Sequence, residues 1–245
     1  MKVLVCISHV PDTTTKINFT PDNKSFVSQG VQFVINPYDE IALTRALELT
    51  EKSGGSVTVI NVGEVSTEPT IRKALAIGAA DAVRINAHPK EAMFVATQVA
   101  EYVKKNPFDL ILCGRESIDF NGGSVPSMIG EMLGIPSVAI AKTINVENGK
   151  AIIEREIEGG KEIIECVLPL VVGCSESVAV PRIPNMRGIM SARTKPLVVV
   201  EPVAADDFTK VIGYDKPAQR SNVKLVDPAD PGKLLELLHT EKKVI

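Results

Sequence analysis

Several kinds of residue that carry chemistry are scarce in this chain of 245 residues, and each scarcity excludes a class of function. Tryptophan is absent and aromatic residues make up 4% of the sequence, which disfavours a base-stacking surface. The net charge of −3 comes without a basic block, so we expect no nucleic-acid partner. Only three histidines occur, and no Ser/His/acid or Cys/His arrangement stands out. We therefore expect no catalytic residues and no enzyme activity of the chain's own.

The cysteines are also few, and they are scattered through apolar runs without any Cys-x-x-Cys pair: Cys6, Cys113, Cys166 and Cys174. Their spacing predicts reduced thiols and argues against a disulfide framework or a metal site. No window approaches the roughly 18 uninterrupted apolar residues that span a membrane, so no direct membrane insertion is expected. The apolar run in 1–8 is too short for a signal peptide. These absences predict a cytoplasmic protein.

What is present is the composition of an ordinary globular protein, with 44% hydrophobic and 23% charged residues. Short apolar runs alternate with helical patterns as far as Gly134. The expected strands cover 2–8, 56–62, 82–85 and 110–114. The expected helices cover 36–52, 67–77, 90–105 and a segment that begins at 124. Strands alternating with helices predict a parallel sheet covered on both faces, which is a three-layer Rossmann-like α/β fold.

A polar segment, 12–24, follows the first strand and is predicted as a loop with a small hairpin that runs to Ile35. The helix start after it is well marked. Asn36 is expected to cap the helix, Pro37 takes its first position, and Asp39 with Glu40 faces the positive end.

The stretch from Asp109 to Gly134 is the most informative part of the sequence. A buried strand is followed by a polar turn, by Gly122-Gly123, and by a helix that Ser124 opens. Two glycines let the backbone approach a ligand closely, and a helix start presents unpaired N–H groups that attract an anion. A nucleotide phosphate fits this pattern, and an ordinary strand–loop–helix connection explains it equally well. The spacing matches neither the dinucleotide fingerprint nor the P-loop.

Ligands of open parallel sheets bind at the carboxyl ends of the strands, near the point where the strand order reverses. Three loops are expected at that edge, 8–15, 62–67 and 114–124, and the helix start at 36–39 can reach it. His9 is interpreted as a turn histidine, and Glu116 and Asp119 as solvated loop acids. The sequence thus indicates a pocket of nucleotide size with little catalytic equipment.

The second half of the chain has a different pattern. Three strand-like runs joined by turns predict an antiparallel meander at the sheet edge: 137–146, 151–157 and 162–173. The segment 181–196 then mixes methionine and isoleucine with four cations. From Glu201 onward prolines interrupt a stretch of little periodicity before a short helix at 232–239. A tail with so few core residues is expected to be ordered only by lying on something else.

Three ordered motifs carry a resemblance to a known family. They are Ile35-Asn36-Pro37-Tyr38-Asp39-Glu40-Ile41-Ala42, Gly114-Arg115-Glu116-Ser117-Ile118-Asp119, and Pro181-Arg182 with Ile189-Met190-Ser191-Ala192-Arg193-Thr194-Lys195. With them the chain resembles the small (beta) subunit of electron-transfer flavoproteins over essentially its whole length. The segment 154–160 and the late Gln219-Arg220 agree with this resemblance.

The resemblance implies an adenine nucleotide alpha hydrolase-like fold and a heterodimer with a larger alpha subunit that holds most of a shared FAD. It implies that the pair accepts electrons from acyl-CoA dehydrogenases and other flavin dehydrogenases and passes them to a membrane quinone oxidoreductase. AMP would be bound structurally by the beta subunit. Residues 1–200 would form the nucleotide-binding domain, including a recognition loop at 181–196, and 201–245 an extended arm that packs on the alpha subunit.

Carried over by position, the resemblance also implies two sets of site residues. The AMP site would involve Cys6, Asn36, Pro37, Tyr38, Asp39, Val62, Gly114, Arg115, Glu116, Ser117, Ile118, Asp119, Phe120, Asn121, Gly122, Gly123, Ser124 and Val125. Partner docking would involve Arg182, Ile183, Met186, Arg187, Ile189 and Met190. Met186 would be the apolar anchor, because methionine suits a surface that fits several partners. The neighbouring cations, with Arg193 and Lys195, would steer acidic partners; an amphipathic helix packed on its own sheet is the alternative for this segment.

The chain departs from the family at a few positions, and these leave alternatives open. Glu116-Ser117 stands where Gln-Ala is common, and Asp12-Thr13-Thr14 where many members place an aromatic near the flavin. A bifurcating-type subunit would hold a second FAD in place of AMP, although 119–126 matches the loop of those relatives poorly. A stand-alone adenine-nucleotide-binding regulator and a nucleotide-dependent enzyme are the remaining alternatives, and neither accounts for the third motif and the long tail.

Overall fold

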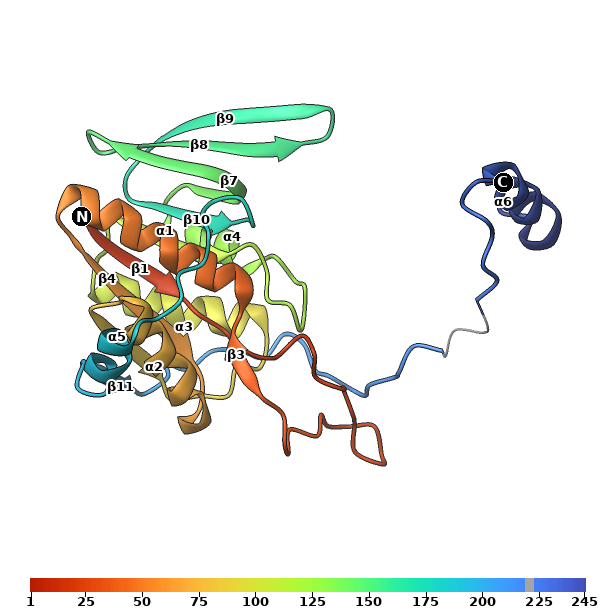
Figure 1. Ribbon diagram of the computed structural model, residues 1–245. Helices are drawn as coiled ribbons and strands as arrows, with labels where there is room; N and C mark the ends of the chain where they lie inside the picture. Colours follow the sequence, from red (N-terminus) through yellow and green to blue (C-terminus); the bar gives the residue numbers. More distant parts are fainter. Residues whose placement is uncertain (219–222) are drawn as a thin grey trace. The chain divides into compact units, whose positions relative to one another are not determined.

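The computed structural model describes residues 1–218 and 223–245 of the chain (Figure 1). These residues divide into two compact units, which are described separately. The larger comprises Met1–Asn18 with Val27–Lys210, and the smaller comprises Phe19–Phe26 with Val211–Ile245. Gln219 and Arg220, which belong to the resemblance noted above, lie outside the described residues.

Nine strands of the described chain form one sheet in the order β11-β5-β4-β1-β6-β10-β7-β8-β9 (Figure 1). They are β1 (Lys2–Cys6), β4 (Ser56–Val62), β5 (Asp81–Ile85), β6 (Leu110–Gly114), β7 (Ser137–Glu147), β8 (Lys150–Ile157), β9 (Gly160–Val167), β10 (Leu170–Cys174) and β11 (Leu197–Val200). Neighbours from β11 to β7 pair in parallel, and β7, β8 and β9 pair antiparallel.

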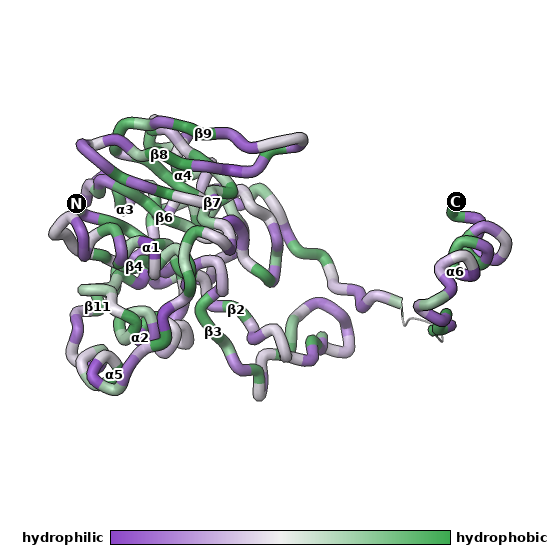
Figure 2. The backbone as a smooth tube through the Cα atoms, turned by 45° about the horizontal axis from the view of Figure 1, so that its top comes forward, coloured by the Kyte–Doolittle hydropathy of each residue, from purple (hydrophilic) through white to green (hydrophobic). Residues whose placement is uncertain are grey.

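Helices cover both faces of this sheet. They are α1 (Pro37–Ser53), α2 (Glu68–Ile77), α3 (Ala92–Lys105), α4 (Val125–Leu133) and α5 (Met186–Ala192), with a 3-10 turn, η1 (Val65–Thr67), before α2. Apolar side chains of α1 and α2 pack with Val3 and Val5, whereas those of α3 and α4 pack with Leu4 and Ile111. Alternate residues of one strand thus serve two cores, as a parallel sheet buried on both faces requires. Figure 2 shows the hydrophobic stretches of the central strands β4 and β6. The expected three-layer Rossmann-like fold is confirmed.

The strand order reverses beside β1. From β1 the chain passes through α1 to β4 on one side, and it returns through α3 to β6 on the other side. The switch point therefore lies between β1 and β6, where Val3, Leu4 and Val5 pair with Leu110, Ile111 and Leu112. A crevice at the carboxyl ends of two such strands is the place where folds of this kind bind ligands.

The third run of the expected meander is not a single strand. It divides into β9 and β10 at Leu168 and Pro169, which are joined by a cis peptide bond. Proline lacks the N–H that a ladder needs, and the five wholly buried residues after it form an apolar run typical of a central parallel strand. β10 accordingly enters the main sheet between β6 and β7. The antiparallel meander at the edge consists of β7, β8 and β9, as expected in kind but with a shorter last strand.

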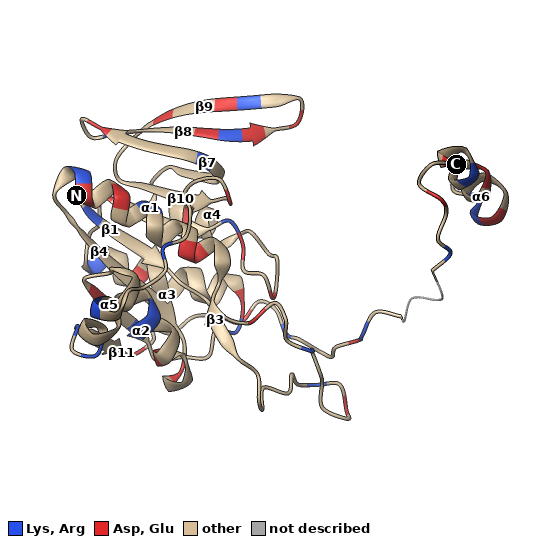
Figure 3. Cartoon of the chain, viewed as in Figure 1, with Lys and Arg blue, Asp and Glu red and all other residues tan. Residues whose placement is uncertain are grey.

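The outer strands of the meander are charged. Figure 3 shows acidic and basic residues along β8 and β9. Lys150 pairs with Glu165 at 2.6 Å and Lys161 with Glu154 at 3.1 Å, across the two strands. Charged side chains on an edge strand discourage further strand pairing. At the other edge β11, which the sequence pattern did not indicate, pairs with β5.

A two-stranded ribbon follows β1. β2 (His9–Pro11) pairs antiparallel with β3 (Phe33–Ile35), so the expected hairpin does run to Ile35. Within the described residues, no helix combines the length and the apolar character that crossing a membrane requires.

The smaller unit joins a short hairpin to the end of the chain. Phe19 bridges to Phe26, and the Phe19 ring stacks on Tyr214 with centroids 4.7 Å apart. The Tyr214 N–H donates to the carbonyl of Asn23 at 2.8 Å. Helix α6 (Pro231–Leu237), continued by a π-helical turn at Leu238–Lys242, confirms the helix expected at 232–239, and none of its residues is buried.

Candidate nucleotide site at the carboxyl edge of the sheet

Most of the predicted site residues lie at the same edge of the sheet. Cys6, Val62 and Gly114 end the parallel strands β1, β4 and β6, and Val125 begins α4. The first turn of α1 lies against this edge through the contacts described next. The structure therefore brings together residues from five separate parts of the sequence, as the fold class requires.

Asn36 is fully buried and joins the start of α1 to the loop after β6. Its Nδ2 donates to the carbonyl of Glu116 at 2.9 Å, and its Oδ1 accepts from the N–H of Ile118 at 3.2 Å. Asn36 does occupy the N-cap position, but its side chain caps nothing within α1, so that part of the prediction is wrong. The physical reason is competition, because the same amide satisfies two buried backbone groups of a distant loop.

Asp39 joins the ends of β1 and β6. It is 4% exposed, and its two carboxylate oxygens accept from the N–H of Ser8 at 2.7 Å and from that of Gly114 at 2.9 Å. Burial raises the pKa of Asp39 from 3.8 to about 7, against the opposing effect of these hydrogen bonds. The acid thus stands in the first turn of α1, as expected, but it bonds to two strand ends. Its neighbour Glu40 pairs with Lys73.

A similar tie holds β4 to β1. The Nδ2 of Asn61, a residue 3% exposed, donates to the carbonyl of Ile7 at 2.8 Å. On β5 the buried Arg84 donates from Nη1 to the carbonyl of Gly63 at 3.0 Å. Buried side chains therefore fix the backbone on both sides of the β1 end.

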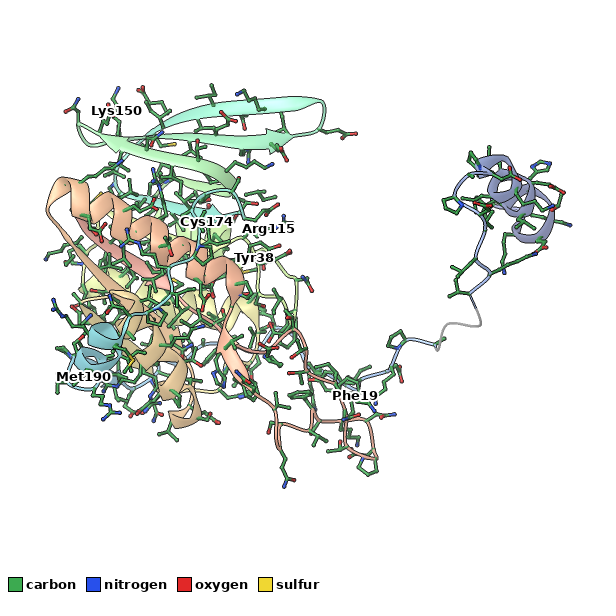
Figure 4. The ribbon with its side chains drawn as sticks, in the orientation of Figure 1. Phe19, Tyr38, Arg115, Lys150, Cys174 and Met190 are labelled. Atoms are coloured by element: carbon green, nitrogen blue, oxygen red, sulfur yellow. The ribbon has the colours of Figure 1, made fainter. Side chains whose placement is uncertain are left out.

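Arg115 is the cation of the site. Its N–H donates to the carbonyl of Cys174 at 2.8 Å, and its guanidinium lies 5.6 Å from the centre of the Tyr38 ring (Figure 4). Its Nε is 3.3 Å from the carboxylate of Glu116, and its Nη1 is 4.0 Å from that of Glu176. Glu116, which stands where the resemblance leads one to expect glutamine, is thus paired with the guanidinium of Arg115.

The outer turn of the loop, 119–123, is exposed and ends in an open helix start. Asn121 and Gly123 have positive φ angles of 51° and 62°. Ser124 makes no side-chain capping bond, and the first backbone bond of α4 is that from Met128 to Ser124 at 3.0 Å. A Cβ placed on Gly122 would meet only the Ser124 Oγ, at 3.9 Å. Val125 and Ser127 supply the first-turn N–H groups of α4, because Pro126 has none, and a helix start of this kind attracts an anion.

Three cysteines lie near the same edge as free thiols. Cys113 and Cys174 are buried, and Cys6 is half-buried. Contact with the Cys6 thiol, together with burial, raises the pKa of Cys113, and burial raises that of Cys174. Within the described part of the chain, no group of three His, Cys, Asp or Glu residues is placed to hold a metal ion. The thiols of Cys113 and Cys174 are therefore neutral.

The predicted docking residues lie on and before α5, away from this crevice. Ile183, Met186 and Met190 are 92%, 74% and 68% exposed. α5 contacts α2 and buries only Ala192, and Asn185 caps it by accepting from the N–H of Gly188 at 2.8 Å. Figure 4 shows Met190 on this helix. A cluster of exposed apolar side chains on a short helix is typical of a docking surface.

Two of the four cationic side chains in 181–196 bond to other groups of the chain. Arg182 forms a bidentate pair with Glu51, at 2.6 and 2.8 Å, which fixes the segment to α1. Lys195 donates from Nζ to the carbonyls of Leu75 and Ala79 at the end of α2, at 2.8 and 2.6 Å. Arg187 and Arg193 form no salt bridge with any described residue. Arg187 and Arg193 are therefore the cations of this segment that remain available to attract an acidic partner.

The sequence reasoning missed the contribution of the β10 end. Ser175 and Glu176 follow β10 and stand beside Arg115, with the Ser175 Oγ donating to Glu176 at 2.5 Å. The signal that marks them is the wholly apolar run after Pro169, which indicates a central strand whose carboxyl end reaches the site. Ser8 and Asn61 contribute through backbone ties that no sequence pattern reveals.

The fold defines the class: a Rossmann-like α/β protein, in which ligands bind at the carboxyl ends of the strands. Comparison with known proteins is more specific. The profile described as "Electron transfer flavoprotein domain" matches residues 24–205. The chain is 34% identical to the electron transfer flavoprotein subunit beta of Bacillus subtilis over the whole of both chains. It is 36% identical to that of Thermoanaerobacterium thermosaccharolyticum (85% of this chain, 80% of the relative) and 33% identical to that of Homo sapiens (90% and 91%).

The chain belongs to the electron transfer flavoprotein family, as a beta subunit. The resemblance seen in three sequence motifs is thereby confirmed. Beta subunits of this family pair with an alpha subunit, and the flavin belongs to the complex. The sheet edge described above therefore belongs to a beta subunit of an electron transfer flavoprotein.

Proposed function

We propose that this chain and an alpha subunit form a heterodimer that carries electrons from flavin dehydrogenases, acyl-CoA dehydrogenases above all, to a membrane quinone oxidoreductase. The alpha subunit holds most of the FAD, and this chain holds AMP as a structural ligand. The chain acts as an electron carrier subunit in the cytoplasm and supplies no catalytic residue. Its own tasks are to hold the nucleotide and to dock partners.

The open start of α4 is the observation that carries the AMP assignment. The first-turn N–H groups of α4 and the backbone at Gly122-Gly123 suit a phosphate, because helix N-termini attract anions. Arg115 belongs to the same loop, and its guanidinium lies beside the carboxylates of Glu116 and Glu176. The adenosine would lie toward Cys6, Val62 and the start of α1. One adenylate phosphate needs no further basic residue, which agrees with the absence of a P-loop.

The FAD supplies the redox chemistry, and this chain would contribute at most contacts to it. The segment where many relatives place an aromatic forms a polar turn here: the N–H and Oγ1 of Thr14 donate to Asp12 at 2.9 and 2.6 Å. That turn offers no ring to stack on a flavin. We therefore assign the flavin environment mainly to the alpha subunit.

Partner dehydrogenases would dock on the exposed apolar cluster of Ile183, Met186 and Met190. Arg187 and Arg193 flank the cluster and would steer acidic partners toward it, since rim charges act mainly on the rate of association. Methionine side chains adapt to more than one partner surface.

The test is to co-express the chain with its alpha subunit and follow flavin reduction by an acyl-CoA dehydrogenase and its substrate. A yellow heterodimer whose flavin is reduced at dehydrogenase-dependent rates is expected. Met186→Ala should slow this reduction about tenfold or more, as loss of a central apolar anchor does at interfaces. Ile163→Ala, which truncates an apolar side chain 66% exposed on β9, is the matched control and should leave the rate unchanged. A colourless, stable monomer that binds ATP or AMP reversibly would favour a stand-alone regulator instead.

A further inference from the structure

Two side chains at the start of α1 form hydrogen bonds with the chain's own backbone. Asn36 and Asp39 make four hydrogen bonds to main-chain groups, all between 2.7 and 3.2 Å. Asn36 is fully buried and Asp39 is 4% exposed. Every polar oxygen and the amide nitrogen of these two side chains therefore has a partner within the chain.

The backbone groups that they hold are far apart in sequence and flank one crevice. Ser8 lies just beyond β1, Gly114 ends β6, and Glu116 and Ile118 belong to the loop that leads to α4. The contacts span from 31 to 82 residues along the chain. One helix turn thus ties together the two strand ends on either side of the switch point and the loop that would receive the phosphate.

At Gly114, α1 and β6 pack too closely to admit a side chain. A Cβ on Gly114 would collide with the Asp39 Oδ1 and with the Tyr38 Cβ and backbone. Close approach of helix and strand is what brings the carboxylate within reach of the Gly114 N–H. The position of the loop after β6 is therefore set by α1.

We propose that Asn36 and Asp39 are positioning residues, which fix the nucleotide-binding loops of this chain before the nucleotide arrives. The proposal rests on the proposed function, since it concerns the same nucleotide site. A preformed site loses less conformational entropy when the ligand binds. Adenylate retention should therefore depend on these two side chains through the backbone groups that they hold.

Because Asp39 is titratable, the proposal predicts that the release of AMP depends on pH. Both carboxylate oxygens accept an N–H, so the ionised form fits the two bonds, and protonation takes one acceptor away. The titratable groups that face Asp39 are the thiols of Cys113 and Cys174, which burial keeps neutral. The hydroxyl of Ser8 and the amide of Asn36 are its other polar neighbours. Because burial raises the pKa of Asp39 to about 7, release of AMP should accelerate as the pH falls through neutrality.

The experiment measures the rate at which AMP leaves the intact heterodimer, by exchange against labelled AMP, between about pH 6 and about pH 8. Asp39→Asn keeps the size of the side chain but has a single acceptor oxygen, and Asn36→Ala removes both of its bonds. Each should release AMP about tenfold faster or more, which is the factor that 1.4 kcal/mol represents. Glu40→Gln is the matched control, because Glu40 lies in the same helix turn but pairs with Lys73. It should release AMP at the wild-type rate.

The pH profile separates positioning from a general loss of stability. The phosphate of AMP has its own titration near pH 6, which is common to all variants. Wild type should show an additional acceleration toward low pH that Asp39→Asn lacks. Wild-type release rates and a wild-type profile in Asp39→Asn would overturn the proposal.

Amide hydrogen exchange on the nucleotide-free heterodimer gives a second readout. The amides of Ser8, Gly114 and Ile118 should exchange faster in the variants that remove their acceptors, and unchanged protection would contradict the proposal. A wild-type heterodimer that contains no adenylate would overturn the proposed function and this proposal together. A loaded wild type with unaffected variants would overturn only the positioning role.

Discussion

At the residue scale, one buried carboxylate links the ends of two strands. Asp39 sits at the switch point with two backbone N–H donors and two neutral thiols around it. Its hydrogen bonds favour the charge and burial opposes it, and burial has the larger effect on the pKa. A group whose folded pKa lies above its unfolded value adds stability below the unfolded pKa and loses it as the pH rises.

This sign leads to a prediction for stability. The contribution of Asp39 to the free energy of unfolding should fall as the pH rises from about 4 to about 7. Relative to Asp39→Asn, wild type should lose about 2 kcal/mol of stability between pH 5 and pH 7, at about 1.4 kcal/mol for each pKa unit. Urea unfolding of the two proteins at several pH values measures the difference. An Asp12→Asn variant is the control, because hydrogen bonds from Thr14 lower the pKa of the exposed Asp12, so its slope has the opposite sign.

A pair of glycines provides a second prediction at this scale. Gly114→Ala should lower the free energy of unfolding by about 1–3 kcal/mol, because the new methyl group overpacks against Asp39 and Tyr38. Gly122→Ala meets open space at an ordinary φ and should change stability by less than about 0.5 kcal/mol. Denaturant titration of both variants checks this. Equal stabilities would show that the contact between α1 and β6 is looser than the structure has it.

The sequence indicated which residues lie at this sheet edge, but not the hydrogen-bond partners of their side chains. The resemblance placed Asn36, Asp39 and Gly114 at the site, and the structure places them at one sheet edge. It did not show that the two polar side chains bond to Ser8, Glu116 and Ile118. A capping signal is local, whereas these partners are tens of residues away, so the choice between them is made by tertiary packing.

At the scale of elements, helix α5, the proposed docking helix, is held by two reciprocal sets of hydrogen bonds to the region of α2. Lys195 donates to the carbonyls of Leu75, in the last turn of α2, and of Ala79, just beyond it, and Arg72 donates to the carbonyls of Ala192 and Lys195 at 2.8 and 2.7 Å. Cations at a helix C-terminus also interact favourably with its dipole. The exposed apolar cluster is thus presented on a fixed base.

Removing one tie should loosen α5 without unfolding the chain. Lys195→Met is expected to raise hydrogen exchange in Met186–Ala192 several-fold and to slow flavin reduction by dehydrogenases. Arg193→Met removes a neighbouring cation that forms no salt bridge with a described residue, so it should weaken steering at low salt while leaving α5 protected. Exchange mass spectrometry and stopped-flow reduction distinguish the two effects. Equal exchange in both variants would contradict the role given to Lys195.

Elements with strong periodicity were predicted closely, and those defined by long-range pairing were not. The limits of β4 and β6 agree with the sequence pattern, because each is an apolar run bounded by turn residues. β10 and β11 were missed as separate strands of the main sheet. Their existence depends on which strand they lie beside, which a pattern of apolar residues does not state.

At the scale of the whole molecule, the described residues form two units with different kinds of order. The larger has two apolar cores, and residues as late as Val203 are tied to it through Gln98, whose amide bonds the Val203 backbone twice at 2.8 Å. The smaller is built from the Phe19–Phe26 hairpin and the end of the chain, and its helix α6 buries none of its residues. Exposed leucines on such a helix suit a role in assembly.

Deleting 211–245 therefore separates folding from assembly. The remaining chain should keep its cooperative unfolding, because both apolar cores lie outside the deleted segment. It should fail to co-purify with the alpha subunit, because the deleted segment makes up most of 201–245, which the resemblance implies to be the arm. Circular dichroism and affinity co-purification measure the two properties. A truncated chain that still assembles would show that the alpha subunit binds elsewhere.

The central claim is that the strand-edge site of this beta subunit permanently holds one AMP. The most direct measurement is to denature the purified heterodimer and to identify and count the released nucleotides by mass spectrometry. One AMP and one FAD per heterodimer are predicted. Two FAD and no AMP, or no adenylate beyond a single FAD, would contradict the claim.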